Sequence, residues 1–296
     1  TQVAAFSTAA VSNMSTDQVA SLTSDQTVAL TTSQVSNLSS DQVLALTSSQ
    51  IRSLKTTQIG ALTTDQAAVL SADQVASFSA TQISSIETAD FAKLSADAVA
   101  ALTTSQVKAL TTAQIKAFAT DQISSIGTDQ IASMSFSQVR ALETADLVML
   151  QDEQLQAMTA ANIAALETSQ LSKLTSDQFA ALTTSQIRAL TLDQVKAISS
   201  AQASQMSTGQ IAAMTGFQTE SLATSVLVNL TPDALGAISA SNIPALTSSQ
   251  LSAFTTDMVA QLGNTQVTSL RAAQINGLSS SQLNALSTAQ VRSLSN

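Results

Sequence analysis

The chain has 296 residues, of which 44% are hydrophobic and only 10% are charged, and its formal net charge is −9. An acidic surface repels nucleic acid and anionic membranes, and no stretch approaches the roughly 18 apolar residues of a membrane span. The absence of Cys and His removes disulfides, thiolate metal sites and the commonest general base. We therefore expect no enzymatic activity, no cofactor, no metal site and no catalytic residue.

The sequence is a continuous eight-residue repeat of 37 octads (37 × 8 = 296), without insertion or deletion. The consensus reads [ST]-[TS]-[DSA]-Gln-[VI]-x-[AS]-Leu. We letter its positions a to h, so that Thr103 stands at a, Gln106 at d, Val107 at e and Leu110 at h. Position h is apolar in all 37 octads, and d is Gln in 28. A repeat this regular decides the architecture before any single motif does.

Most octads carry the signals of one helix start. Ser or Thr followed three residues later by Gln is a capping box, and the apolar residues at h and e form a hydrophobic staple around it. Acidic residues gather at a to d and basic residues at f or g, which suits the helix dipole. The pattern predicts one helix of five to seven residues per octad, with capping residues such as Thr103, Gln106, Thr111, Gln114, Thr183 and Gln186.

The octads cannot belong to one long helix, because eight residues at about 100° each rotate the apolar stripe by about 80° per octad. The remaining candidates are an α-solenoid of short helices and, as the alternative, a β-solenoid. A β-solenoid favours alternating β-branched residues and recurrent Gly or Asn at its corners, whereas Ala, Leu and Gln dominate here. The missing Gly at any fixed position indicates a link without left-handed backbone. We therefore predict an all-α solenoid over residues 1–296, a single continuous array that is a fragment of a longer one.

Positions h and e are expected to form the core, while the variable position f faces solvent. A single octad buries too little apolar surface to fold alone, so neighbours must stack cooperatively. The expected core includes Leu22, Leu30, Val35, Leu38, Leu102, Val107, Leu110, Ile115, Leu182, Ile187, Leu190, Leu286, Val291 and Leu294.

Two features depart from the regular octad. Between residues 215 and 246 the consensus weakens, and Pro244 stands at position f, where a proline removes a helix hydrogen bond and clashes with the preceding turn. Phe136 and Phe217 fall in the cap region rather than at e or h, and we expect them to be exposed candidates for contact with a partner.

Residues 101–110 (ALTTSQVKAL) and 181–190 (ALTTSQIRAL) resemble the Ser/Thr/Gln/Ala-rich octapeptide arrays of very large bacterial surface or secreted, adhesin-like proteins. That resemblance implies an extracellular or cell-surface location and a structural or adhesive role. From the uniform repeat we expect a rigid fibre, stalk, filament or surface-layer component that associates with itself. The alternative is a repetitive binding module for a glycan, another cell-surface ligand or an ordered lattice such as ice. Nucleic acid is not an expected partner.

Overall fold

The computed structural model describes residues 2–294, which fall into two compact units, one up to Ala157 and one from Met158. Within the described part of the chain every octad forms one short helix and no residue belongs to a strand. The prediction of an all-α architecture is therefore confirmed, and the β-solenoid is unsupported. That the octads form a single continuous solenoid over 1–296 concerns how the units join, and it stays a prediction.

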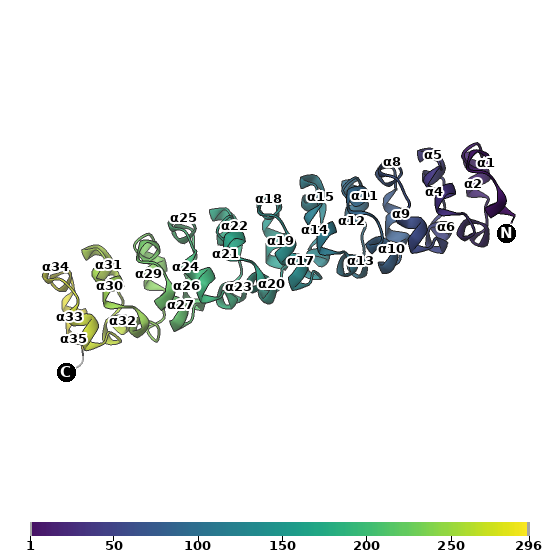
Figure 1. The fold of residues 1–296 in the computed structure, drawn as a ribbon. Helices are drawn as coiled ribbons and strands as arrows, with labels where there is room; N and C mark the ends of the chain where they lie inside the picture. Colours follow the sequence, from purple (N-terminus) through teal and green to yellow (C-terminus); the bar gives the residue numbers. More distant parts are fainter. Residues whose placement is uncertain (1, 295–296) are drawn as a thin grey trace. The chain divides into compact units, whose positions relative to one another are not determined.

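Figure 1 shows the short helices stacked side by side within each unit. The first unit contains η1 (Val3–Ala5), α1 (Thr8–Ser12), α2 (Thr16–Ala20), α3 (Ser24–Val28), α4 (Thr32–Ser36), α5 (Ser40–Leu44), α6 (Ser48–Ser53), α7 (Thr56–Ile59), α8 (Thr64–Ala68), α9 (Ala72–Ser77), α10 (Ala80–Ser84), α11 (Thr88–Phe91), α12 (Ala96–Ala100), α13 (Thr104–Ala109), α14 (Thr112–Lys116), α15 (Thr120–Ser125), α16 (Thr128–Ala132), α17 (Phe136–Ala141), α18 (Thr144–Leu147) and α19 (Asp152–Ala157).

The second unit repeats the same arrangement. It contains α20 (Ala160–Ala165), α21 (Thr168–Leu171), α22 (Ser176–Ala181), α23 (Thr184–Ala189), α24 (Leu192–Lys196), α25 (Ser200–Ser204), α26 (Thr208–Ala213), α27 (Gly216–Ser221), α28 (Thr224–Leu227), α29 (Pro232–Gly236), η2 (Ile243–Ala245), α30 (Ser248–Ser252), α31 (Thr256–Gln261), α32 (Asn264–Thr268), α33 (Ala272–Asn276), α34 (Ser280–Asn284) and α35 (Thr288–Ser293).

Two extended residues separate consecutive helices, as α13 and α14 show. Leu110 at h has φ −58° and ψ 137°, and Thr111 at a has φ −73° and ψ 157°. No described residue has a positive φ. The chain therefore turns without left-handed backbone, which is why no octad needs Gly at a fixed position.

The α-helices are four to six residues long, slightly shorter than the five to seven expected. The five four-residue helices share an N-cap without a Ser or Thr hydroxyl: Lys55, Glu87, Glu143, Glu167 and Ala223. Isolated helices of this length are unstable in water, so each one depends on its caps and on packing against its neighbours.

Within each unit a helix packs against the helix three octads along the chain, for example α10 against α13 and α23 against α26. The core side chains follow the same offset. The rings of Phe91 at e and Phe118 at h, three octads apart, meet edge to face with centroids 5.5 Å apart. An e side chain thus packs toward later octads and an h side chain toward earlier ones.

Burial of the expected core residues agrees with this direction of packing. Ten of the fourteen are buried: Leu30, Val35, Leu38, Leu102, Val107, Leu110, Ile115, Leu182, Ile187 and Leu190. Leu22, Leu286 and Leu294 are half-buried. The prediction that Val291 belongs to the core is wrong, because its side chain is 51% exposed. It stands at e, the position that packs toward later octads, in the last octad that the structure describes.

Pro244 changes the helix type of its octad. Where the neighbouring octads form α-helix, this one forms the 3-10 helix η2, with Pro244 at its second residue. The N–H groups of Ala245 and Leu246 reach back only three residues, to the carbonyls of Asn242 and Ile243, at 2.9 and 3.1 Å. A 3-10 turn avoids the clash that Pro causes inside an α-helix, so the octad keeps its place in the stack.

Candidate functional site

The predicted capping residues form their reciprocal bonds. The Gln106 N–H donates to Thr103 Oγ1 at 3.2 Å, and the Thr103 N–H donates to Gln106 Oε1 at 2.7 Å. Thr111 with Gln114 and Thr183 with Gln186 form the same pair of bonds. Each box therefore satisfies two of the N–H groups that a helix start leaves without a partner.

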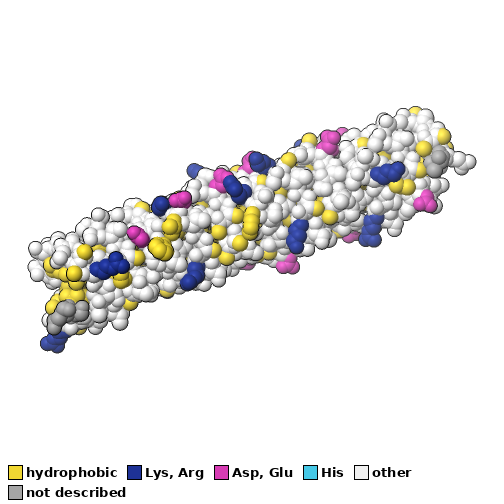
Figure 2. Space-filling view, turned by 60° about the horizontal axis from the view of Figure 1, so that its bottom comes forward, with side chains coloured by type: hydrophobic (Ala, Val, Ile, Leu, Met, Phe, Trp, Pro, Cys, Tyr) yellow, Lys and Arg dark blue, Asp and Glu magenta, His cyan; other side chains and the backbone are white. Residues whose placement is uncertain are grey.

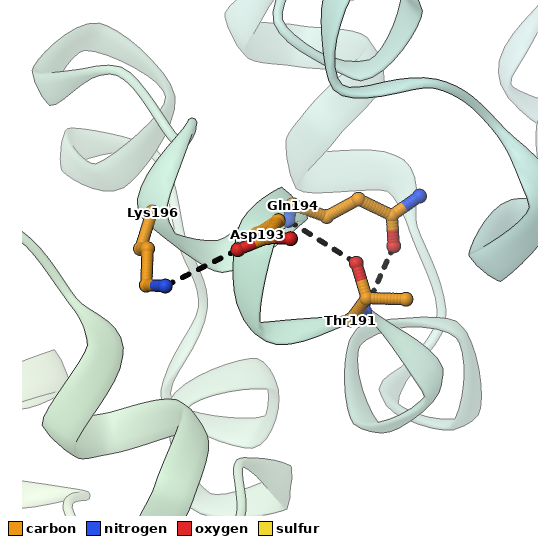
Figure 3. A network of polar contacts seen from close by, with 4 residues as sticks. All are labelled: Thr191, Asp193, Gln194 and Lys196. Atoms are coloured by element: carbon orange, nitrogen blue, oxygen red, sulfur yellow. Dashed lines mark hydrogen bonds and ion pairs between the residues drawn. The ribbon is translucent and has the colours of Figure 1, made fainter.

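The same Gln side chain also binds a second helix, four octads earlier. In Figure 3 the amide of Gln194 extends beyond its box with Thr191. Its Nε2 donates to the carbonyls of Ile163 at 3.0 Å, Ala164 at 3.3 Å and Leu166 at 2.7 Å. These carbonyls lie at the end of α20, where a helix leaves its last C=O groups unsatisfied.

This contact recurs along both units, and we call it the position-d ladder. Gln114 donates to Ile83 and Ile86, both at 2.9 Å, in the first unit. Gln210 donates to Leu182 at 2.8 Å in the second. The bonded residues stand 28 to 31 positions before the Gln. Since helices three octads apart also pack together, between three and four octads complete one turn of the stack in each unit.

The sequence carried a signal for this ladder beyond the capping box. A capping box accepts Glu as readily as Gln at its last position, yet none of the 37 octads has Glu at d. A carboxylate could accept the N-cap N–H but could not donate to a carbonyl. The exclusion of Glu therefore indicates that position d needs an amide donor.

Two buried carboxylates interrupt the ladder in the first unit, Asp90 and Asp146, both 5% exposed. Each follows the same Glu-Thr-Ala sequence. Burial raises the pKa of Asp146 above its ordinary value of 3.8, and the Glu143 charge adds to that rise, while a backbone hydrogen bond to Glu143 opposes it. Asp90 instead accepts a hydrogen bond from the Thr64 hydroxyl at 2.8 Å.

The second unit has a hollow of about 620 Å³ on its surface, between α27, η2 and the start of α33. We name it the 217–271 hollow. It is lined by Phe217, Glu220, Ser241, Asn242, Pro244 and Arg271, with Thr215, Gly216 and Ala245 completing the wall. Most of these residues belong to the stretch 215–246, where the sequence departs from the consensus.

The two predicted contact residues are both exposed. Phe217 is 74% exposed at the 217–271 hollow, and Phe136 is 56% exposed on α17. Figure 2 shows hydrophobic and charged side chains scattered over a largely uncharged surface. The ion pair between Lys196 Nζ and Asp193 Oδ1, 3.1 Å apart, is exposed and joins residues of one helix. Such pairs contribute little stability.

No group of three or more acidic side chains that could hold a metal ion occurs among residues 2–294. Across the same residues no helix is long and apolar enough to cross a membrane.

Comparison with known proteins agrees with the repeat. No curated protein matches the sequence. The sequence model of the ALTTAQ repeat family, however, matches residues 1–32, 28–56, 48–80, 83–120, 107–136, 139–176, 163–192, 179–216 and 259–296. The segment between the last two matches, residues 217–258, contains Phe217, Glu220 and Pro244 of the hollow. Since the matched segments cover most of the chain, this protein belongs to the ALTTAQ repeat family.

Proposed function

We propose that this chain is a structural repeat protein of the cell exterior, a fibre, stalk or surface-layer component that associates with itself. The observation that carries the proposal is the position-d ladder. Because the same side chain joins many octads in each unit to the octad four earlier, successive turns present equivalent residues at the exposed positions b, c and f. Equivalent surfaces can meet other copies of the chain many times over, so that weak contacts add together.

The surface composition supports self-association rather than strong repulsion between copies. Charged residues make up only 10% of the sequence, and large apolar side chains are exposed on the sides of the helices, among them Leu44 at 51% and Phe136 at 56%. Exposed apolar side chains contribute to association when two copies bury them.

Negative-stain electron microscopy and light scattering over a concentration series test the proposal. We expect filaments or lateral bundles to appear as concentration rises, and Phe136→Ser to shift their onset to higher concentration. Thr104→Ser, an exposed change that removes only a methyl group, is the matched control. Particles that remain single at every concentration would contradict self-association.

Protease treatment of intact cells that make the natural protein tests its location, because an exterior protein is cleaved while the cells stay whole.

The alternative, a repetitive surface that matches a ligand through its Ser and Thr rows, receives less support. The hydroxyls at position a already accept hydrogen bonds from the helix start, as Thr103 and Thr183 do. The position-a hydroxyls are therefore already engaged in capping the helices.

A further inference from the structure

Residues that are exceptional in the sequence converge on the 217–271 hollow. Glu220 is the only acidic residue outside positions a to d, and Arg271 is one of two basic residues outside f and g. Pro244 is one of two prolines, and Phe217 is one of two phenylalanines outside the core positions. Phe217, Pro244 and Arg271 lie 27 residues apart in succession, and the turn of the stack brings them to one place.

The apolar side of the hollow continues along the second unit. Side chains at position c lie next to side chains at position b of the octad three earlier. Gly209 and Thr184 show this, because a Cβ placed on Gly209 would lie 3.6 Å from Thr184 Cγ2. Phe217 and Leu192 occupy the same two positions on α27 and α24, which pack together, and Leu192 is 42% exposed. Leu192, Phe217 and Pro244 thus present apolar surface on three successive turns. This shape suits an elongated ligand lying along the stack.

The polar side of the hollow offers both donors and acceptors. The side chains of Glu220 and Arg271 make no hydrogen bond or ion pair with another described residue. Asn242, which is 9% exposed, donates its amide to the Met214 carbonyl at 2.7 Å and keeps Oδ1 near Gly216, within 3.7 Å of where a Cβ would stand. Among residues 2–294, the Ser241 hydroxyl pairs only with that of Ser239. One cation, one anion, an amide oxygen and a hydroxyl therefore line the same hollow as the exposed ring.

We propose that the 217–271 hollow binds a neutral oligosaccharide, with a sugar ring on Phe217 and its hydroxyls bonded to Glu220 and Arg271. A sugar ring has an apolar face of C–H groups and a rim of hydroxyls that both donate and accept. The C–H face packs on an aromatic ring, while the hydroxyls match a carboxylate and a guanidinium equally well. An anionic ligand suits the site less, because Glu220 lies in it and the chain carries a net charge of −9.

A peptide ligand is disfavoured by the same surface. Peptides commonly bind by adding a strand to a sheet edge or by laying an amphipathic helix into a long apolar groove. Residues 2–294 contain no strand to extend. The exposed apolar surface here comes from Leu192, Phe217 and Pro244, and the last two share the hollow with the charged Glu220 and Arg271.

The experiment is an array of immobilised neutral oligosaccharides probed with the 296-residue chain, followed by titration calorimetry with the best-bound sugar. Phe217→Ala is expected to weaken binding about tenfold or more, and Arg271→Gln to weaken it by several fold. Phe136→Ala and Lys55→Gln are the matched controls, since they remove an exposed Phe and a basic N-cap elsewhere. Both controls should stay within about twofold of the parent, and circular dichroism should show all four variants folded.

Three results would overturn the proposal. The first is an array on which no immobilised sugar retains the chain, together with no binding of free sugar at millimolar concentration. The second is a sugar whose affinity is lowered equally by Phe217→Ala and Phe136→Ala. The third is Phe217-dependent capture of peptides, but of no sugar, on a parallel peptide array. Because binding is measured on the single chain in dilute solution, these results are distinct from failure of the chain to form filaments.

Discussion

A single side-chain amide at position d joins the start of one helix to the end of another. The Gln194 Oε1 accepts the Thr191 N–H at 2.8 Å, and its Nε2 donates to the Leu166 carbonyl at 2.7 Å. Backbone groups at helix ends are costly to bury without partners. One residue type at one position therefore removes two such costs wherever its Nε2 reaches the carbonyls of the octad four earlier.

Replacing the buried carboxylate of Asp146 tests this residue-scale argument. Its raised pKa means that the folded chain binds this proton more tightly than the unfolded chain does. The cost of burying the charge is thus present above the folded pKa and is relieved as pH falls toward 3.8. We expect Asp146→Gln to stabilise the first unit by about 1 kcal/mol at neutral pH, because it removes that cost and restores an amide donor. The gain should shrink on acidification.

Chemical denaturation at neutral and at mildly acidic pH measures this effect. Asp90→Gln is the matched control, since it stands in the same sequence context but gives up the bond from the Thr64 hydroxyl. Its gain should be smaller. A gain for Asp146→Gln that is absent at neutral pH, or that grows on acidification, would show the account of this carboxylate to be wrong.

At the scale of the helix, the octad tolerates a change of helix type more easily than a loss of register. η2 replaces an α-helix by a 3-10 turn, yet Ile243 at e remains fully buried and Leu246 at h is 2% exposed. Asn242 still reaches one carbonyl four octads earlier, that of Met214. The two ends of the octad are fixed by its core and ladder contacts, so the middle can adapt.

Proline substitutions separate these two effects. Arg188→Pro places a proline at position f of the six-residue α23 and should destabilise the second unit by about 3 kcal/mol, because it removes a helix hydrogen bond and clashes with the preceding turn. Pro244→Ala, at the same position of η2, should change the stability by less than about 1 kcal/mol. Thermal unfolding followed by circular dichroism measures both. Equal changes in stability for the two variants would mean that the 3-10 helix η2 does not relieve the clash caused by Pro244.

Much of the fold could be predicted from the sequence, whereas the ladder could not. The boxes of Thr103 and Thr183 involve residues three apart, so local rules suffice to place them. The partner of Gln114 lies 28 to 31 residues away, and its identity depends on how many octads make a turn. Nothing in one octad states that number.

The candidate site could not be predicted for the same reason, because its assembly depends on the number of octads in one turn of the stack. Phe217 and Pro244 depart from the repeat in the sequence itself, whereas Glu220 and Arg271 are only exceptions to the usual placement of charges within the octad. Their placement at one hollow follows from the turn of the stack. Exposure of Val291 likewise depends on the packing of position e toward later octads, which no local pattern reveals.

At the scale of the molecule, stability in each unit is shared among octads that are distant in sequence. Within each unit most helices contact helices three octads away, and the ladder adds bonds across four octads. An octad therefore cannot unfold without exposing the carbonyls and core side chains of its neighbours. Cooperative unfolding over several octads is the expected consequence.

The most direct test of the ladder is to compare Gln114→Glu with Gln18→Glu. Both residues accept the N-cap N–H, but Gln114 also donates to two buried carbonyls, whereas the exposed Gln18 donates to no described residue. Glu keeps the first bond and loses the others. We predict that Gln114→Glu destabilises the first unit by about 2–4 kcal/mol in denaturant unfolding, while Gln18→Glu changes it by less than about 0.5 kcal/mol. Equal stability of the two variants would contradict the claim that the ladder holds the octads together.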